Sequence, residues 1–463
     1  MSENPLHLLL DARRAKKQGP TAIEERRRTR LAEMVAHARA NSPYYRELYR
    51  GLPGRVEDPA LLPITSKKAL MARFDDWSTD RRVNVEEARA FVADPDLVGE
   101  RFLGKYTVAT TSGTTGTRGI FLLDDRNLAV TNALATRMVG AWLGPGDVLR
   151  IVARGGRMAM VMATGGHFAS AVAAARLRKG SLPSLRARLI RTFPVQTPMP
   201  ELVAGLNRFR PAVVAPYAST AALLAAEQET GRLRIDPVLL ALAAEGLPAG
   251  ERDRIAKAFD ARVGDSYAAT EVPFLSYGCA HGWYHVNADW VVLEPVDADH
   301  RPVPPGEPSH TVLVSNLANR VQPILRYDLG DSIVRRPDPC PCGAPLPAIR
   351  VQGRAADVLT FPADHTGRDA GRVAVAPLAF GTLVDRTPGI ELFQVAQTAP
   401  ATLRVRLRPA AGADPESVWR AVQDEITRLL ASHGLGHVAV ERAAEPPEQS
   451  PGGKYRTIIP LGR

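Results

Sequence analysis

The chain has 463 residues, of which 45% are hydrophobic and 23% charged, so it is too long for one hydrophobic core and has an ordinary globular composition. Lysine and arginine number 59 against 49 acidic residues, a net charge of +10, but the densest basic run, residues 24–30, sits beside two glutamates in an expected helix. We therefore exclude a nucleic-acid surface and expect a diffuse positive field that favours anionic small molecules.

The amino terminus and the cysteine content indicate a cytoplasmic protein. The apolar run at residues 8–10 is followed at once by Asp11 and Arg13, so we expect no signal peptide. No apolar stretch approaches the roughly 20 residues that span a bilayer, and we expect no membrane contact. Three cysteines, an odd number, argue against a disulfide framework and for reduced thiols.

Helices are expected first along the chain, followed by an alternation of strands and helices. Residues 21–50 are expected to form an amphipathic helix with a break at Ser42-Pro43, and residues 60–105 to form short helices and turns. Apolar strands should then alternate with Ala/Leu-rich helices, which implies a parallel sheet covered by helices. The expected strands lie at 148–153, 212–215 and 239–245, and the expected helices at 169–177, 220–228 and 250–259.

The sequence becomes richer in strands from Tyr284 onward. The expected elements are strands at 290–294, 311–315, 392–396 and 402–407, and a helix at 417–432. We therefore expect an α/β protein in two parts. Residues 1–356 should form a large N-terminal core of parallel-sheet layers and a small β subunit, and residues 357–463 a small, mobile α+β C-terminal domain.

The segment 110–119, TTSGTTGTRG, combines three glycines with six hydroxyl side chains. Glycine lets the backbone N–H groups approach a ligand closely, and hydroxyl groups add further donors, so this loop is suited to phosphate oxygens. Its spacing differs from the Gly-Lys-Ser/Thr pattern of the common nucleoside triphosphatase loop. The loop predicts a nucleotide-using enzyme.

Other motifs accompany this loop in a fixed order. They are NSPYYR at 41–46, LPITSK at 62–67, SYAATE at 266–271, RYDLGD at 326–331, GRAAD at 353–357 and SPGGKYR at 450–456. Together with the loop, they resemble the motifs of the adenylate-forming ligases, and within them the branch of phenylacetate:CoA ligase and coenzyme F390 synthetase. The resemblance covers nearly the whole chain, and it implies an enzyme that uses ATP and Mg²⁺.

The resemblance also implies roles for individual residues. The loop residues that would hold the phosphates of ATP are Thr111, Ser112, Gly113, Thr114, Thr115 and Gly116; Arg118 stands where the family has a lysine. Tyr267 would stack near adenine, Thr270 would bind near the α-phosphate, and Glu271 would hold Mg²⁺, a cation that prefers oxygen ligands. Asp331 would accept hydrogen bonds from both ribose hydroxyls.

The remaining implied roles fall near the expected domain boundary, at the C-terminus and in the acyl pocket. Arg354 would lie near the ribose or the phosphates, and Asp357 would be the hinge. Lys454 would be catalytic, because its ammonium group can screen the attacking carboxylate from the α-phosphate and stabilise the charge as pyrophosphate leaves. The candidate substrate-pocket residues are Trp142, His167, Phe168 and Tyr217, although ordinary core packing explains each of them as well.

All three cysteines fall in two short segments, CAHGWYH at 279–285 and CPCG at 340–343. Three thiolates and one imidazole complete the tetrahedral set of a structural Zn²⁺ site. The expected ligands are Cys279, Cys340, Cys342 and one histidine. His285 fits the resemblance better, and His281 is the alternative. Buried, unliganded thiols remain the other interpretation.

These observations lead to one main hypothesis. The protein activates a small, aromatic carboxylic acid as an acyl-adenylate and transfers the acyl group to coenzyme A. An amine or another nitrogen nucleophile is the alternative acceptor, and a zinc-stabilised nucleotide-binding protein without turnover is the alternative of another class. The sequence leaves the identity of the acid and the oligomeric state open, a homodimer included.

Overall fold

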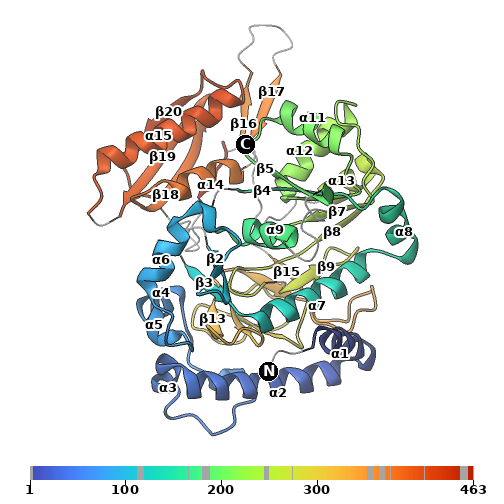
Figure 1. Cartoon of the computed structure of the whole chain (residues 1–463), viewed down its shortest axis with the longest axis vertical. Coiled ribbons are helices and arrows are strands. Elements are labelled where there is room, and N and C mark those ends of the chain that lie inside the picture. Colours follow the sequence, from blue (N-terminus) through green and yellow to red (C-terminus); the bar gives the residue numbers. More distant parts are fainter. Residues whose placement is uncertain are drawn as a thin grey trace. The chain divides into compact units, whose positions relative to one another are not determined.

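The computed structural model describes residues 4–111, 119–164, 166–179, 188–243, 250–273, 275–351, 359–363, 371–375, 377–410, 412–448 and 457–461. The chain divides into two compact units (Figure 1). Unit 1 comprises Met1–Thr110, Ile120–Leu149 and Arg262–Arg354, and unit 2 comprises Thr111–Gly119, Arg150–Ala261 and Ala355–Arg463. Each unit is therefore assembled from segments that are far apart in the sequence.

Three helices open unit 1, and each begins with proline. They are α1 at Pro5–Gln18, α2 at Pro20–Asn41 and α3 at Pro43–Leu48. Proline suits a first helical turn because an N–H at that position has no partner within the helix. Ser42 ends α2 and caps α3, where its hydroxyl accepts a hydrogen bond from the Tyr45 N–H at 3.3 Å. The predicted helix with a break at Ser42-Pro43 is confirmed.

Ion pairs tie α1 and α2 to the rest of unit 1. The Asp11 carboxylate accepts hydrogen bonds from Arg26 at 2.9 Å and from Arg30 at 2.5 Å. The Arg30 guanidinium also donates to the carbonyl of Asp289 at 2.7 Å and lies 3.6 Å above the ring of Trp290. Stacking on the indole face and hydrogen bonding together use both the charge and the flat shape of arginine.

The other helices of unit 1 are mostly short, as predicted for residues 60–105. They are η1 at Pro59–Leu61, α4 at Lys67–Ala72, α5 at Phe74–Trp77, α6 at Val85–Ala93, η2 at Pro95–Leu97 and the longer α7 at Asp125–Trp142. The side chains of Asn84 and Asp124 cap α6 and α7 by accepting hydrogen bonds from backbone N–H groups of the first turn.

The strands of unit 1 pair antiparallel in the described sheets β1-β2-β3, β11-β12-β13 and β14-β15-β10-β9. Their bounds are β1 Arg101–Phe102, β2 Tyr106–Thr110, β3 Ile120–Leu123, β9 Ser276–Gly278, β10 Tyr284–Val286, β11 Val291–Val296, β12 Thr311–Asn316, β13 Ile324–Asp328, β14 Ile333–Arg335 and β15 Ala348–Val351; β8, at Arg262–Asp265, precedes β9. The predicted strand-rich segment after Tyr284 is confirmed.

Unit 2 contains a parallel sheet of order β5-β4-β6-β7. The strands are β4 Met158–Met162, β5 Ile190–Pro194, β6 Val213–Pro216 and β7 Leu239–Leu242. The helices that alternate with them are α9 Ala169–Lys179, α11 Met199–Phe209, α12 Ala218–Glu229 and α13 Glu251–Phe259. This alternation of strand and helix confirms the predicted parallel α/β layer.

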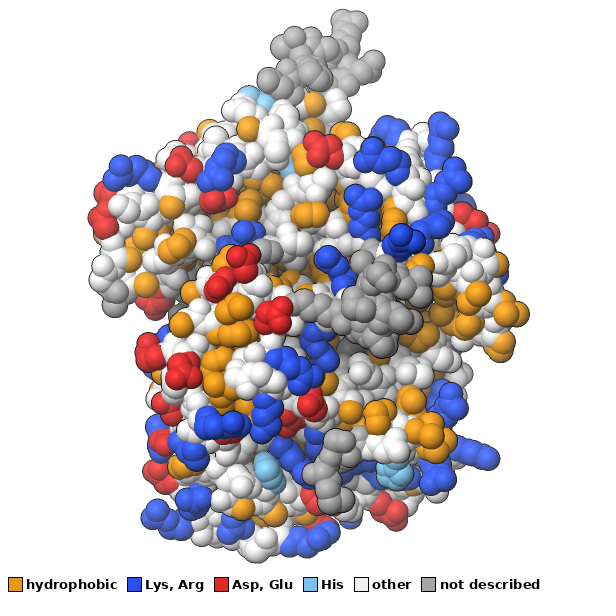
Figure 2. Space-filling model, viewed as in Figure 1, with side chains coloured by type: hydrophobic (Ala, Val, Ile, Leu, Met, Phe, Trp, Pro, Cys, Tyr) orange, Lys and Arg blue, Asp and Glu red, His pale blue; other side chains and the backbone are white. Residues whose placement is uncertain are grey.

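Residues 148–153 form the end of a helix, α8 at Pro145–Ala153, and the predicted strand at this position is wrong. The Gly144 N–H donates to the Asp147 carboxylate at 3.0 Å, and Pro145 occupies the first turn, so local chemistry starts a helix here. Leu149 is 70% exposed and Val152 is 68% exposed. Figure 2 shows hydrophobic side chains gathered at the right, where Figure 1 labels α8.

The C-terminal part of unit 2 is an α+β arrangement with its own core. Its elements are β16 Leu359–Pro362, β17 Arg372–Val375, α14 Pro377–Arg386, β18 Ile390–Ala399, β19 Thr402–Pro409, α15 Pro415–Ser432, β20 Ala439–Arg442 and β21 Ile458–Ile459. The sheet order is β20-β19-β18-β21, and its core includes the fully buried Val395 and Val405 of the sheet and Val422 and Ile426 of α15. The predicted α+β C-terminal domain is confirmed. The boundary at Asp357 lies outside the described residues and stays a prediction.

The core of unit 1 packs helices on antiparallel sheets. Trp77, Tyr45 and Tyr327 are among its largest side chains with almost no solvent exposure.

Among the helices that the structure describes, none combines the length and the apolar character that are needed to cross a bilayer.

Candidate functional site

Tyr267 and Asp331, predicted from two separate motifs, meet in unit 1. The Tyr267 hydroxyl donates a hydrogen bond to Asp331 Oδ2 at 2.7 Å. The backbone at Tyr267 is held by Ser276, whose N–H and hydroxyl both donate to the Tyr267 carbonyl, at 3.0 and 3.1 Å. Asp331 is buried, with 6% exposure. The predicted adenine contact and the predicted ribose contact therefore lie side by side.

The turn before Asp331 is fixed by a second set of hydrogen bonds. Gly330 has a φ of +77°, which favours glycine, and its N–H donates to the Asp328 carboxylate and to the Thr311 hydroxyl, each at 3.1 Å. The Thr311 hydroxyl in turn donates to Asp328 at 2.5 Å. Asp328 therefore orders the turn that precedes Asp331.

Glu271, the predicted Mg²⁺ ligand, is 5% exposed and receives a hydrogen bond from the Tyr327 hydroxyl at 2.8 Å to Oε1. The Glu271 carbonyl accepts from the Asn316 side chain at 3.1 Å, which fixes the backbone. Burial, together with the charge of Glu271, raises the pKa of Tyr327 well above its ordinary value, so the hydroxyl stays a donor. Thr270 lies half-buried beside Glu271.

The segment around Tyr327 is also bound to the LPITSK motif. Thr65 forms a parallel bridge with Tyr327; its N–H donates to the Arg326 carbonyl at 2.9 Å, and its carbonyl accepts from the Asp328 N–H at 2.9 Å. Arg326 has a positive φ of +46°. Its guanidinium donates to the carbonyls of Ala60, at 3.0 Å, and Leu62, at 2.6 Å. The motif at 62–67 therefore holds the backbone of residues 326–328 in place. The sequence did not reveal this role.

Several predicted residues lie outside the described part of the chain. They are Ser112, Gly113, Thr114, Thr115, Gly116, Arg354, Asp357 and Lys454. Thr111 and Gly119, the described ends of the predicted phosphate loop, are hydrogen-bonded to each other: the Thr111 N–H donates to the Gly119 carbonyl, and the Gly119 N–H to the Thr111 hydroxyl, each at 3.0 Å. The ends of the loop are thus closed as in a hairpin.

The candidate acyl-pocket residues fall in both units. In unit 2, the Tyr217 hydroxyl accepts from the Ala163 N–H at 3.0 Å and lies 3.0 Å from the Ser170 hydroxyl. Phe168 packs against the apolar cluster that contains Tyr217, and His167 is 1% exposed. These three candidates therefore follow the ends of the neighbouring strands β4 and β6. Their role in acyl binding stays a prediction.

Trp142 lies in unit 1, where it packs on glycine. Its indole N–H donates to the Gly278 carbonyl at 2.9 Å. A Cβ atom at Gly264 would come within 2.3 Å of the Trp142 ring. The indole is thus seated on the backbone of β8, an arrangement that explains Gly264. The role of Trp142 in the acyl pocket stays a prediction.

The cysteine and histidine cluster forms as predicted in unit 1. The ligand atoms of Cys279, His285, Cys340 and Cys342 all lie within 4.8 Å of one another. Cys279 Sγ is 3.7 Å from Cys340 Sγ, close to the roughly 3.8 Å expected between two sulfurs on one tetrahedral Zn²⁺. Cys342 Sγ is 3.1 Å from His285 Nε2. His281 is exposed and is not part of the cluster.

The surroundings of the cluster orient the imidazole of His285 and shift the pKa values of two of the thiols. His285 Nδ1 lies 3.2 Å from the Leu346 carbonyl, which fixes the tautomer that leaves Nε2 free to coordinate. Burial opposes ionisation of Cys279, but hydrogen bonds from His285 and from backbone N–H groups outweigh it and lower the pKa of that thiol to about 6. Burial raises the pKa of Cys340 to about 11. These residues fit a structural zinc ion.

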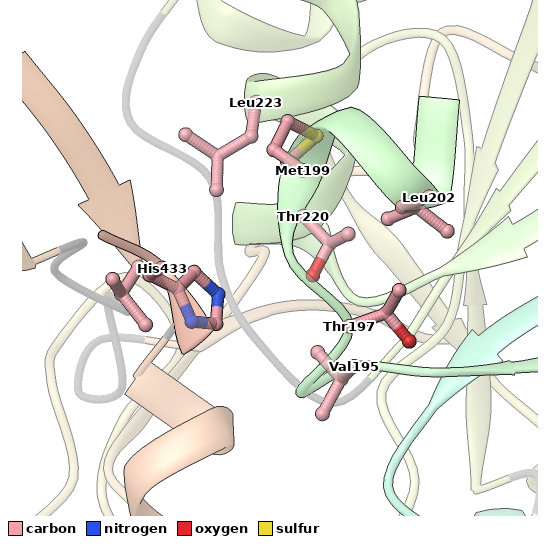
Figure 3. Close-up of a pocket in the computed structure, with 8 residues that line it drawn as sticks. Val195, Thr197, Met199, Leu202, Thr220, Leu223 and His433 are labelled. Carbon is pink, nitrogen blue, oxygen red and sulfur yellow. The ribbon is translucent and has the colours of Figure 1, made fainter. Parts of the chain in front are cut away.

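A separate apolar pocket lies within unit 2. It is lined by Val195, Thr197, Met199, Leu202, Thr220, Leu223, Val375 and His433. Figure 3 shows His433, which directly follows α15, facing side chains from α11, α12 and the loop between β5 and α11. Burial lowers the pKa of His433, so its imidazole is neutral near pH 7. This pocket contains none of the predicted site residues.

Comparisons with solved structures show the fold. A 2-hydroxyisobutyryl-CoA ligase in complex with 2-HIB-AMP and CoA in the thioesterification state has 21% sequence identity and a TM-score of 0.57, over 96% of this chain and 89% of that chain. Its open conformation with 2-HIB-AMP and CoA has 20% identity and a TM-score of 0.53, over 95% and 91%. Neither protein-family models nor curated proteins gave a match. The chain therefore has the fold of the adenylate-forming ligases.

Proposed function

We propose that the protein uses ATP and Mg²⁺ to activate a small, aromatic carboxylic acid as an acyl-adenylate and then transfers the acyl group to coenzyme A. One observation carries this proposal: the aromatic-x-x-Thr-Glu and Tyr-x-x-Gly-Asp motifs are joined by the hydrogen bonds from Tyr267 to Asp331 and from Tyr327 to Glu271. The fold that the chain shares with a CoA ligase over 96% of its length supports it.

The described carboxylates suit two different parts of ATP. Asp331, next to the aromatic ring of Tyr267, would accept hydrogen bonds from both ribose hydroxyls while the ring stacks on adenine. Glu271 would bind Mg²⁺ through Oε2, because Oε1 already accepts a hydrogen bond from Tyr327. Thr270, which precedes Glu271 in the sequence, would donate to the α-phosphate.

The residues outside the described part complete the proposed chemistry. The loop from Thr111 to Gly116 and Arg354 would hold the phosphates. A carboxylate oxygen of the acid attacks the α-phosphorus, and the bond to pyrophosphate breaks, with Lys454 stabilising the charge. The coenzyme A sulfur then attacks the acyl carbon, and AMP leaves. Asp357 would be the hinge that lets the C-terminal domain change position between these two steps.

The chemistry of the acceptor and of the metal cluster is also part of the proposal. Coenzyme A is an anionic thiol, and the net charge of +10 favours its approach. We propose that the Cys₃His cluster holds a structural Zn²⁺, since four ligands leave no open coordination position for catalysis.

A pyrophosphate-release screen over aryl and aliphatic acids, with and without coenzyme A, tests the function. We expect release with aryl acids and a thioester product only when coenzyme A is present. Lys454→Ala should reduce pyrophosphate release on the order of 10²-fold or more, because the lysine stabilises charge that develops in the transition state. Absence of release with every acid would contradict the proposal, and release without thioester formation would favour an amine acceptor.

A further inference from the structure

The two motifs hold each other's carboxylates. Each motif contains a tyrosine four positions before its own acid: Tyr267 before Glu271, and Tyr327 before Asp331. Tyr267 donates to Asp331, 64 positions away, and Tyr327 donates to Glu271, 56 positions away. The result is a reciprocal pair of hydrogen bonds across the site.

Both halves of this arrangement are anchored on rigid backbone. On one side, the Tyr267 carbonyl is held by Ser276, and the Glu271 carbonyl is held by Asn316. On the other side, Tyr327 lies opposite Thr65 in a parallel bridge. Its two neighbours, Arg326 and Asp328, make the backbone hydrogen bonds to Thr65. The hydroxyl groups are therefore delivered from fixed positions, and each carboxylate can be oriented by its partner.

We propose that Tyr267 and Tyr327 are positioning residues that act across the site, Tyr267 on the ribose-binding carboxylate of Asp331 and Tyr327 on the metal-binding carboxylate of Glu271. This inference rests on the proposed function, because it assigns a task to each of the two acids. Tyr327 was not singled out by the sequence motifs, and the stacking role expected of Tyr267 uses its ring rather than its hydroxyl.

The chemistry of a phenol suits this task. A neutral O–H donor bound to a carboxylate makes a short, charge-assisted hydrogen bond but adds no positive charge that would compete with Mg²⁺. Each hydroxyl donates to one carboxylate oxygen, Oδ2 of Asp331 or Oε1 of Glu271, so the contact fixes the orientation of the carboxylate. An arginine at either position would engage both oxygens and block the ligand.

The reciprocal arrangement predicts crossed effects. Tyr267 belongs to the metal-binding motif, yet its hydroxyl should affect the recognition of ribose. Tyr327 belongs to the ribose-binding motif, yet its hydroxyl should affect the dependence on Mg²⁺. A purely structural role would change both properties together or neither.

The ribose arm of the test is calorimetric binding of ATP and of 2′-deoxy-ATP, with no turnover required. Tyr267→Phe should weaken ATP binding about tenfold and reduce the preference for ATP over 2′-deoxy-ATP by a similar factor. Asp331→Asn should remove that preference. The double variant should bind ATP no more weakly than Asp331→Asn alone, because the two side chains act through one contact.

The metal arm is ATP binding at a series of free Mg²⁺ concentrations. Tyr327→Phe should raise the Mg²⁺ concentration for half-maximal binding about tenfold and leave the preference for ATP over 2′-deoxy-ATP unchanged. Glu271→Gln should abolish the dependence on Mg²⁺ at this site.

Tyr45→Phe is the matched control. Tyr45 is a buried tyrosine of unit 1 whose hydroxyl donates to the Pro323 carbonyl at 2.9 Å, and that carbonyl also accepts from the Trp77 indole at 2.8 Å. The control should change neither readout. If Asp331→Asn alters ribose preference and Tyr267→Phe does not, the positioning role is overturned and the proposed function stands. If the parent protein shows no ATP binding, both are overturned.

Discussion

Unit 1 contains two clusters of polar side chains. Each cluster joins two segments that are distant in the sequence, but the two clusters differ in their chemistry. The tyrosine and carboxylate pairs join residues 267–271 to residues 327–331, and the cysteine and histidine cluster joins residues 279–285 to residues 340–342. In the first, each hydroxyl donates to one oxygen of a carboxylate. In the second, four ligand atoms converge on one point. The first arrangement therefore suits reversible binding, and the second suits permanent closure.

The largest expected effect separates the two clusters through Asp331→Ala. Removing the carboxylate deletes two proposed hydrogen bonds to ribose, each worth about 1.5 to 3 kcal/mol, so ATP affinity should fall about 10²-fold or more. Metal content should stay unchanged. Calorimetry with ATP and metal analysis by mass spectrometry measure the two quantities. Unchanged ATP affinity would leave Asp331 as a residue of the turn after β13.

Cys340→Ser is the reverse experiment. We expect about one zinc per chain in the parent protein prepared without chelators, and much less in the variant, because one of the four ligands is lost. The melting temperature should fall by several degrees, while the ATP affinity of the folded fraction should be retained. His281→Ala is the control, since His281 lies outside the cluster and should keep the metal. A parent protein without zinc would leave the cysteines as buried thiols.

Asp11→Asn should have the smallest effect and should spare both clusters. Burial opposes ionisation of Asp11, but its hydrogen bonds to Arg26 and Arg30 outweigh burial and hold its pKa below the ordinary value of 3.8. The lowered pKa means that this carboxylate stabilises the fold fully above pH 3.8 and progressively less as the pH falls through the lower folded value.

The variant should therefore lose about 1 kcal/mol of unfolding free energy at pH 7, and this loss should shrink as the pH falls below 3.8. Denaturant unfolding at pH 7 and below pH 3.8 checks this, and a difference that grows on acidification would contradict it. Equal ATP affinity and metal content in the variant would show that the N-terminal helices are independent of both sites.

Local chemistry explains where the sequence predicted the structure well and where it did not. Ser42-Pro43 marks a helix boundary because a cap and a first-turn proline are adjacent, and the structure has that boundary. Residues 148–153 were predicted as a strand from their apolar character alone. The capping interaction between Gly144 and Asp147 starts a helix there instead, and the apolar side chains stay exposed.

The same limit applies to the candidate site. The choice between His281 and His285 depended on which side chain reaches the three sulfurs, and only the pairing of β10 with β9 and β15 places His285 there. The partner of Tyr327 lies 56 positions away, so no local spacing could reveal it. A signal was nevertheless present: both motifs have a tyrosine four residues before the acid. A repeated spacing of that kind marks a pair worth testing for contact.

At Arg326 the backbone conformation and the side-chain contacts favour different amino acids. Its φ of +46° would suit glycine, which adopts that region without a steric cost. Glycine, however, would leave the carbonyls of Ala60 and Leu62 without the guanidinium that now binds them. Arg326 therefore combines a backbone conformation that costs energy with hydrogen bonds that attach residues 60–62 to the strand of the site.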